Sequence, residues 1–454
     1  MILVLAEIGN PEWANQTTLH PLGLVAVVVL GLVMLVAPRR YAVLPMIVMA
    51  CFVASAQRLV VVGFDFNLLR LMVLFGWARI LLRGENRGFV WKPLDLTIVL
   101  WLLCGAAIYT ILHGTLDAFI NRLGWAYDAA GMYFLFRCLI RTWSDVEDII
   151  IGFAWVSIPL AGAFVLEQFT GRNVFSIFGG VPAITVIREG RLRCQGAFSH
   201  PILAGCFWAS LIPLFAGLWW RGGQSRTWSV VGLSAALIIV IMCASATPVT
   251  AVALALVAAA FFPLRKSMAF VRWGILASLV GLHLFMNAPV WHLISRITVV
   301  GGNTGWHRYH LIDQAINRIG EWGLIGTKST SHWGWGLADV TNQYVLVGVR
   351  GGLLTLILFV AVIALAFRAV GRLLARSAPD RFRTVFTWAI GASLFVHCMN
   401  YIAVSYFGQI SIVWFMLLAI IGSLDAAHGY RHVVVSPKVG YGGVELHRVA
   451  SQRA

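Results

Sequence analysis

Long apolar runs, separated by mostly short polar loops, fill most of the chain. A helix needs about 20 predominantly apolar residues to cross a membrane. About thirteen windows meet that need, near 20–37, 42–58, 66–82, 94–112, 123–140, 147–167, 200–219, 228–244, 247–263, 270–287, 344–367, 383–402 and 408–425. The pattern predicts an all-α integral membrane protein with about 12–13 transmembrane helices in a polytopic domain, 1–425, followed by a polar, basic tail, 426–454.

The positive charges between these windows predict how the chain is oriented. Every odd-numbered loop is basic, as shown by Arg39 and Arg40 after the first window, and by Arg221 and Arg226 after the seventh. Arginine and lysine collect in cytoplasmic loops. We therefore expect the odd-numbered loops and the tail 426–454 to be cytoplasmic and the N-terminus to face outward. The two long even-numbered loops, about 168–199 and 288–343, then lie on the outer side.

Composition narrows the class of protein further. Of the 454 residues, 60% are hydrophobic and 11% are charged, whereas soluble proteins carry about 25% charged residues. Basic cytoplasmic loops and their attraction to anionic lipids account for most of the net charge of +16. No soluble basic domain is present that would bind nucleic acid. The seven cysteines lack the spacing of a paired metal site, so no metal and no cofactor are expected.

The first long outer loop is rich in arginine, although basic residues are expected in the cytoplasmic loops. It holds Arg172, Arg188, Arg191 and Arg193 against a single carboxylate, Glu189. Membrane topology does not explain basic residues on the translocated side. These arginines therefore predict a local anionic partner.

Within this loop, Arg191, Arg193 and His200 are candidate substrate-binding residues, because they lie directly before a predicted span. The planar guanidinium matches phosphate oxygens in a bidentate way, and a lipid phosphate or lipid-linked diphosphate is the obvious anion at a membrane surface. The alternative is that the arginines reach toward lipid headgroups. His200, which precedes Pro201, then does no more than mark the start of a helix.

The second long outer loop contains a stretch with helical periodicity, from Trp306 to Ile319. We expect it to form an amphipathic helix that lies in the outer interface. The N-terminal end of such a helix offers free amide groups and a positive dipole. Together with Arg308 these groups predict an anion site, the alternative being a solvated arginine.

The segment 326–344 joins this helix to the next span and carries the candidate catalytic residues. Either His332 or Asp339 would remove a proton from a sugar hydroxyl. Trp333 and Trp335 suit either stacking on a sugar ring or a place in an interfacial aromatic belt.

Residues 150–370 resemble the O-antigen ligase and O-antigen polymerase superfamily, which consists of bacterial multi-span glycosyltransferases. Three motifs carry the resemblance, namely Arg193, Gly196, His200 and Pro201 before a span, then Arg308 before the glycines at 323 and 326, and finally Asn342 and Tyr344 before the glycines at 348, 351 and 352. The order of the motifs and the large outer loop are also similar.

The resemblance implies roles for particular residues. Arg193 and Arg308 match the two family arginines that hold the donor diphosphate, and Arg191, His200 and Asn342 fall in the same motifs as substrate-binding residues. Many relatives carry a catalytic histidine where this chain has Thr341, so His332 or Asp339 would take that role. Ser245-Ala-Thr-Pro248 stands where relatives often carry Ser-Arg-Gly.

The implied activity is metal-independent transfer or polymerisation of undecaprenyl-diphosphate-linked oligosaccharide at the periplasmic face of the bacterial inner membrane. The acceptor would be another glycan or a lipid A core, and other envelope polysaccharide assembly proteins are expected partners beside membrane lipids. A small-anion transporter and a non-catalytic scaffold are the alternatives. A transporter predicts ionisable residues deep in the spans and helices broken at the midplane.

Overall fold

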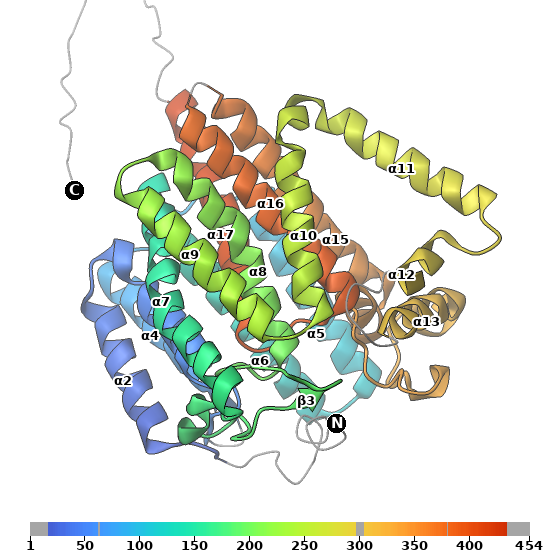
Figure 1. Ribbon diagram of the computed structural model, residues 1–454, viewed down its shortest axis with the longest axis horizontal. Coiled ribbons are helices and arrows are strands. Elements are labelled where there is room, and N and C mark those ends of the chain that lie inside the picture. Colours follow the sequence, from blue (N-terminus) through green and yellow to red (C-terminus); the bar gives the residue numbers. More distant parts are fainter. Residues whose placement is uncertain (1–16, 62–63, 297–303, 379, 434–454) are drawn as a thin grey trace, which may run out of the picture.

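Each of the thirteen apolar windows contains a helix in the computed structural model, which describes residues 17–61, 64–296, 304–378 and 380–433. The helices are α2 (Pro21–Val36), α3 (Leu44–Phe52), α4 (Leu68–Arg83), α5 (Pro93–His113), α6 (Leu116–Leu139), α7 (Trp143–Thr170), α8 (Pro201–Leu218), α9 (Gln224–Met242), α10 (Ala246–Ala260), α11 (Met268–Phe285), α15 (Gln343–Arg376), α16 (Arg381–Ala403) and α17 (Ile410–Val433) (Figure 1). This confirms an all-α integral membrane protein.

Eight helices of the described chain are long and apolar enough to cross a membrane by themselves. Two of the others are α4, which has only 16 residues, and α6, and both carry charged residues. Arg70 of α4 and Asp128 of α6 form an ion pair inside the protein, in which Nε and Oδ1 are 2.8 Å apart. The intramembrane carboxylate at 128 is thus paired with a neighbouring arginine.

The window 42–58 is only partly helical. Helix α3 stops at Phe52, and the segment that follows makes a turn in which the amide of Gln57 donates to the carbonyl of Ala54 at 3.2 Å. Val53, Ala54 and Gln57 are all buried. Non-helical backbone is tolerated at membrane depth where protein covers it, and here neighbouring elements cover it.

The odd-numbered loops meet at one end of the helix bundle, which we call the basic end. Arg39 pairs with Asp145 at the start of α7, with Nη1 and Oδ2 2.9 Å apart. Arg221, after α8, contacts Glu147 at 3.1 Å. The alternation predicted from loop charge therefore corresponds to a real division between two ends of the molecule.

The even-numbered loops gather at the opposite end, which we call the loop end. Two antiparallel hairpins lie there, β1 (Arg58–Val61) with β2 (Phe64–Asn67), and β3 (Ile187–Arg188) with β4 (Arg191–Leu192). Ser55 and Ser199 share a hydrogen bond of 2.7 Å between loops that are far apart in sequence. The short helices α12 (Leu293–Arg296), α13 (Thr304–Asn317) and α14 (Ile319–Trp322) complete this end (Figure 1).

Helix α15 was predicted as one continuous span but is interrupted at Gly352, where φ is 70° and ψ is 179°. The loop after α14 docks into the interruption. The amide of Leu353 donates to the carbonyl of Gly323 at 2.7 Å, and the amide of Thr327 donates to the carbonyl of Val349 at 2.7 Å. These bonds satisfy backbone groups that the interruption would otherwise leave unpaired.

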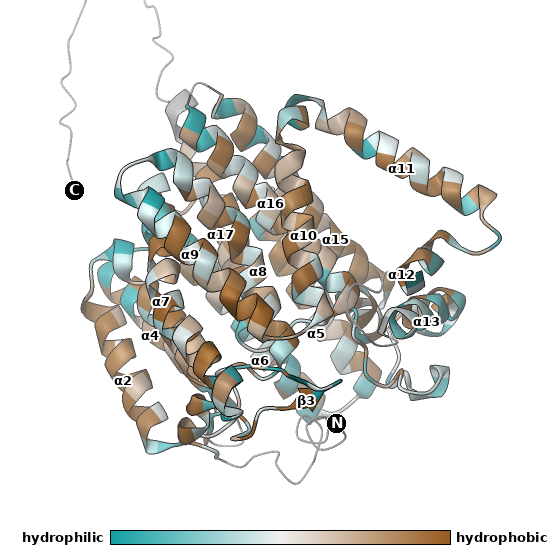
Figure 2. Cartoon of the chain, viewed as in Figure 1, coloured by the Kyte–Doolittle hydropathy of each residue, from teal (hydrophilic) through white to brown (hydrophobic). Residues whose placement is uncertain are grey.

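Helix α11 stands apart from the rest of the bundle, and Figure 2 shows that its surface is largely hydrophobic. None of its eighteen residues is buried, and Phe285 at its end is 91% exposed. Lipid is the natural environment of such a helix. At the C-terminus, α17 continues to Val433 and so includes the first residues of the predicted tail, whereas 434–454 lie outside the described residues.

Candidate functional site

Two arginines that are 115 positions apart in the sequence meet at the start of α10. Nη2 of Arg193 lies 3.4 Å from Oγ of Ser245. Nη2 of Arg308 donates to Oγ1 of Thr247 at 2.8 Å. Because these two hydroxyls are only two residues apart, both guanidinium groups lie near the start of α10, at the loop end of the bundle.

The N-terminal end of α10 adds hydrogen-bond donors to this place. Ser245 is the N-cap residue, but its side chain makes no capping hydrogen bond. The amides of Ala246 and Thr247 and the positive end of the helix dipole are therefore available to an anion, whereas Pro248 has no N–H to donate. Nε of Arg193 is buried and has no hydrogen-bond partner in the described structure. The site thus offers several donors, and no carboxylate of the described residues contacts either guanidinium.

The electrostatic environment of the arginines favours a bound anion. Burial, followed by the neighbouring charge of Arg188, lowers the pKa of Arg193. Burial likewise lowers the pKa of Arg308. Arginine stays charged in proteins, so the site holds two charges in an unfavourable setting. An anion placed between them would lower the energy of both.

A carboxylate at the end of α7 holds the loop that presents Arg193. Glu167 is buried and accepts hydrogen bonds from the amides of Gln195 and Gly196, at 3.2 and 3.0 Å, and from the hydroxyl of Thr185 at 3.0 Å. A carboxylate that receives several donors orients a loop firmly. Glu167 therefore fixes both sides of the turn in which Arg193 lies.

Gly196 is required at its position in this turn. Its φ is 56°, and a Cβ atom there would come within 2.5 Å of the ring of Phe164. Nδ2 of Asn173 donates to the carbonyl of Gly196 at 2.7 Å, and Nε2 of Gln409 donates to the carbonyl of Ala197 at 2.7 Å. The family-like glycine thus serves the close packing of the arginine loop.

His200 caps α8 and lies within the electrostatic influence of Arg193. Its Nδ1 accepts a hydrogen bond from the amide of Ile202 at 3.1 Å. Burial, then the charges of Arg193 and Arg188, lowers the pKa of His200 to about 4. The imidazole is neutral near pH 7, so His200 adds shape and polarity to the site but no positive charge.

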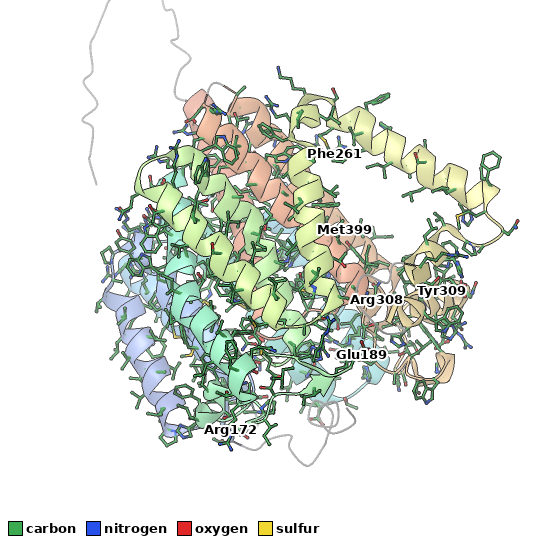
Figure 3. The ribbon with its side chains drawn as sticks, in the orientation of Figure 1. Arg172, Glu189, Phe261, Arg308, Tyr309 and Met399 are labelled. Atoms are coloured by element: carbon green, nitrogen blue, oxygen red, sulfur yellow. The ribbon has the colours of Figure 1, made fainter. Side chains whose placement is uncertain are left out.

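Helix α13 carries Arg308 and confirms the predicted amphipathic helix. Leu311 and Ala315 are buried, and they pack in a small cluster with Trp322 and with residues of α15. Arg308, Leu311 and Ala315 share one face at helical spacing. Packing of that face directs the guanidinium inward, toward α10. In Figure 3, Arg308 projects into the region between α13 and the bundle.

The loop 334–339 passes over α13 beside Arg308. A Cβ atom at Gly336 would lie 3.7 Å from the His307 ring, and Asp339 acts electrostatically on His307. Burial lowers the pKa of His307, against the opposite effect of Asp339. A neutral imidazole next to an arginine, under the electrostatic influence of a carboxylate, is a suitable proton acceptor.

No hydrogen bond among the described residues joins the side chains of the other predicted site residues, His332, Asn342 and Arg191, to the guanidinium of Arg193 or Arg308. His332 pairs with Glu321, with Nε2 and Oε1 2.9 Å apart, at the surface of the loop after α14. Asn342 caps α15, because its Oδ1 accepts from the amide of Val345 at 3.0 Å while its amide donates to the carbonyl of Ile402 at 3.1 Å. Arg191 is exposed in strand β4.

Sequence reasoning did not identify several residues that shape the site. Ser245 and Thr247 lie in the segment 245–248, which differs from the Ser-Arg-Gly that O-antigen ligases and polymerases often carry and which was not predicted to bind a ligand. Glu167 falls at the end of a predicted span. Arg188, rather than Arg191, acts electrostatically on Arg193 and His200. The pairing of β3 with β4 places Arg188 opposite Arg191. Strands of two residues are too short for the sequence to predict this pairing.

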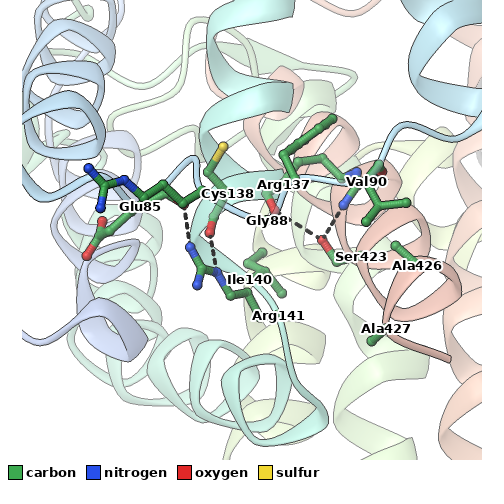
Figure 4. Close-up of a pocket in the computed structure, with 12 residues that line it drawn as sticks. Glu85, Gly88, Val90, Arg137, Cys138, Ile140, Arg141, Ser423, Ala426 and Ala427 are labelled. Carbon is green, nitrogen blue, oxygen red and sulfur yellow. Dashed lines mark hydrogen bonds between the residues drawn. The ribbon is translucent and has the colours of Figure 1, made fainter. Parts of the chain in front are cut away.

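A separate cavity of about 240 Å³ lies at the basic end (Figure 4). It is lined by Glu85, Arg137, Arg141 and Ser423, among others. Arg137 is bound to Asp95 at 2.9 Å there. The cavity therefore belongs to the structural ion pairs of the basic end. In the described residues, no group of three histidine, cysteine, aspartate or glutamate side chains could hold a metal ion.

A scan against protein-family models finds no family that matches this chain, and a search of curated proteins finds no matching relative.

Proposed function

We propose that this protein is a membrane glycosyltransferase whose donor is an undecaprenyl-diphosphate-linked oligosaccharide. The observation that carries the proposal is the convergence of Arg193 and Arg308 on the start of α10. Two guanidinium groups and a helix N-terminus match the charge and the oxygen count of a diphosphate. The resemblance to O-antigen ligases and polymerases, which rests on the same two arginines, supports this assignment.

The reaction needs little beyond these groups. The acceptor hydroxyl oxygen attacks the anomeric carbon of the donor sugar, the bond from that carbon to the diphosphate oxygen breaks, and the electron pair leaves with the diphosphate. The hydroxyl proton passes to a protein base. Arg193 and Arg308 stabilise the charge that grows on the leaving group. They supply the charge that a metal ion supplies elsewhere, so the proposed transfer is metal-independent.

The base in this proposal is His307 with Asp339, rather than His332. His307 adjoins Arg308 in sequence and has Asp339 as its electrostatic partner. His332 instead lies against Glu321 at the surface. The acceptor is a second glycan or a lipid A core. The proposed location is the bacterial inner membrane, with the loop end in the periplasm, where it meets envelope polysaccharide assembly proteins.

A small-anion transporter is the second candidate, because the interruption of α15 at Gly352 is the kind of broken helix that transporters use. The interruption does not leave its backbone groups free for an ion, however. The loop 323–327 occupies them with hydrogen bonds. The glycosyltransferase proposal is therefore the stronger one.

A transfer assay tests the proposal directly. Purified protein is supplied with undecaprenyl-diphosphate glycan and chelator, without nucleotide sugar. We expect glycan to lengthen on the carrier or to move to a core oligosaccharide, and Arg308→Ala to reduce the rate by about 10²–10³-fold, as for loss of one charge-stabilising donor.

Arg172→Ala is the control, because Arg172 is an exposed arginine of the loop end outside the site. It should transfer at the wild-type rate. Equal rates for Arg308→Ala and the wild type, or anion flux into vesicles without any transfer, would exclude the proposed role.

A further inference from the structure

A second group of cations lies at the loop end, around Tyr109 near the end of α5. The guanidinium of Arg122 on α6 stacks 3.7 Å from the centre of the Tyr109 ring. The His113 ring lies 4.2 Å from the same ring. Arg350 of α15 acts electrostatically on Arg122, and the charges of Arg350 and Lys328 act on His113. We call these four residues and Tyr109 the Tyr109 cluster.

The Tyr109 cluster contains three permanent or near-permanent positive charges and no counter-charge. No ion pair joins Arg122, Lys328 or Arg350 to a carboxylate in the part of the chain that the structure describes. Arg122 is only 7% exposed, and its Nε is buried with no hydrogen-bond partner. A buried, unpaired guanidinium donor is costly, so a fold that keeps one beside a second arginine reserves it for an anion.

Two ordinary explanations do not account for the cluster. Basic residues accumulate in loops at the basic end, but the cluster lies at the opposite end, where α5 finishes and α6 begins (Figure 1). Stacking on Tyr109 stabilises Arg122 but leaves its Nε unpaired and does not offset repulsion from Arg350. A ligand accounts for both features.

The Tyr109 cluster is separate from the site of Arg193 and Arg308. That site is built on α8, α10 and α13, and its electrostatic neighbours are Arg188, Cys206 and His200. The cluster is built on α5, α6 and α15. The two are connected by the loop after α14, which docks onto α15 directly beside Arg350 through the bond between Thr327 and Val349. Lys328 follows in the same loop.

We propose that the Tyr109 cluster is a second phosphate-binding site, which takes the diphosphate of a second lipid-linked glycan. Arginine side chains at the rim of the spans suit a phosphate that is anchored in a bilayer by its lipid. The aromatic pair of Tyr109 and Trp125, each facing Arg122, offers ring surface for an adjoining sugar or isoprenoid unit. This inference rests on the proposed function, because it assigns the second site to the acceptor of the same transfer.

The number of diphosphate sites bears on whether the protein polymerises glycan or transfers it to a lipid A core. An enzyme with two diphosphate sites joins two carrier-bound glycans, which is polymerisation. An enzyme that moves glycan to a lipid A core needs only one. The Tyr109 cluster therefore favours polymerase chemistry for this chain.

Counting bound ligands tests the inference without relying on activity. The probe is undecaprenyl diphosphate, added to the purified protein in detergent, with binding stoichiometry measured by native mass spectrometry and affinity by titration. The wild type should bind two molecules. Arg350→Gln should lose one of them, with affinity at that site lowered about 10–100-fold, as for loss of one charged hydrogen bond. Arg350 is exposed, so folding should be unaffected.

Arg172→Gln, which removes one exposed charge elsewhere at the loop end, should still bind two molecules. The second-site inference is wrong if Arg350→Gln still binds two molecules of undecaprenyl diphosphate. It is also wrong if phosphatidylglycerol at equal concentration displaces undecaprenyl diphosphate from the second site. If Arg308→Ala still binds two while Arg350→Gln binds one, the donor site fails and the Tyr109 cluster stands. Retention of one bound molecule in each single variant also verifies that the variant is folded.

Discussion

At the scale of single residues, the site depends on charges that lack their usual partners. Most ion pairs of this protein join arginine to a carboxylate, as Arg70 is joined to Asp128. Arg193 and Arg308 instead contact the hydroxyls of Ser245 and Thr247. A hydroxyl orients a guanidinium but does not neutralise it, so the positive charge stays available for a ligand.

The pH dependence of transfer distinguishes the two members of the proposed base. If His307 accepts the proton, kcat/KM rises with pH as His307 becomes neutral, and the rise lies below pH 6.5 because burial lowers the pKa of His307. Asp339 opposes that effect. Asp339→Asn should therefore move the rise to still lower pH and reduce the maximal rate.

Initial rates between pH 4.5 and 8, values chosen to bracket the ordinary histidine pKa of about 6.5, provide the measurement. His332→Gln serves as the comparison and should keep the wild-type profile. An unshifted profile in Asp339→Asn, together with an unchanged maximum, would remove Asp339 from the reaction.

At the scale of elements, interrupted helices place the functional loops. The interruption of α15 at Gly352 receives the loop after α14 through paired backbone hydrogen bonds. That loop also carries Lys328, and its continuation brings Asp339 to α13. A straight α15 would have no acceptor or donor for the loop, because a continuous helix satisfies its own backbone groups.

Gly352→Ala should destabilise this arrangement. Gly352 has a φ of 70°, and a Cβ atom there would meet the carbonyl oxygen of Leu324 at 2.3 Å. The left-handed conformation alone costs an alanine about 1–2 kcal/mol, and the contact adds to it. We expect a lower midpoint of thermal unfolding in detergent and slower transfer.

Gly371→Ala is the matched control on the same helix, since a Cβ atom there has nothing within 4 Å. Alanine favours a helix more than glycine does, so the midpoint should not fall. Equal behaviour of the two variants would show that the interruption does not matter for stability.

At the scale of the whole molecule, the division into two ends organises the protein. Arginine–carboxylate pairs connect loops at the basic end, including Arg39 with Asp145 and Arg221 with Glu147. Both candidate anion sites lie at the loop end. This division separates the end held by arginine–carboxylate pairs from the end that carries both candidate anion sites.

Chemical labelling tests which end faces outward. All seven native cysteines are buried or half-buried, so they should react little. A membrane-impermeant maleimide should label Ser329→Cys at the loop end in intact cells and should label Arg226→Cys at the basic end only after lysis, because the basic end is expected to be cytoplasmic. The reverse pattern would invert the topology.

The sequence predicted the helices well and singled out Arg193 and Arg308 as candidate site residues, in both cases for reasons that are local. A lipid-spanning helix must be apolar over its length. Arg193 is notable because it is a basic residue in a loop expected on the outer side, and Arg308 because it lies near the start of an amphipathic helix. The donors at the start of α10 could not be predicted, because their role depends on which loops approach them. The same holds for His307 beside Asp339, and for the Tyr109 cluster, which three separate helices assemble.

Helix α11 has no packed face within this chain, since none of its residues is buried. Nothing in the protein therefore distinguishes leucine from valine or phenylalanine at most of its positions, and only the lipid distinguishes apolar from polar. The helix acts as a tether of set length between α10 and the helices that carry Arg308. We therefore expect α11 to tolerate substitutions among apolar residues, provided that its hydropathy and its eighteen-residue length are kept.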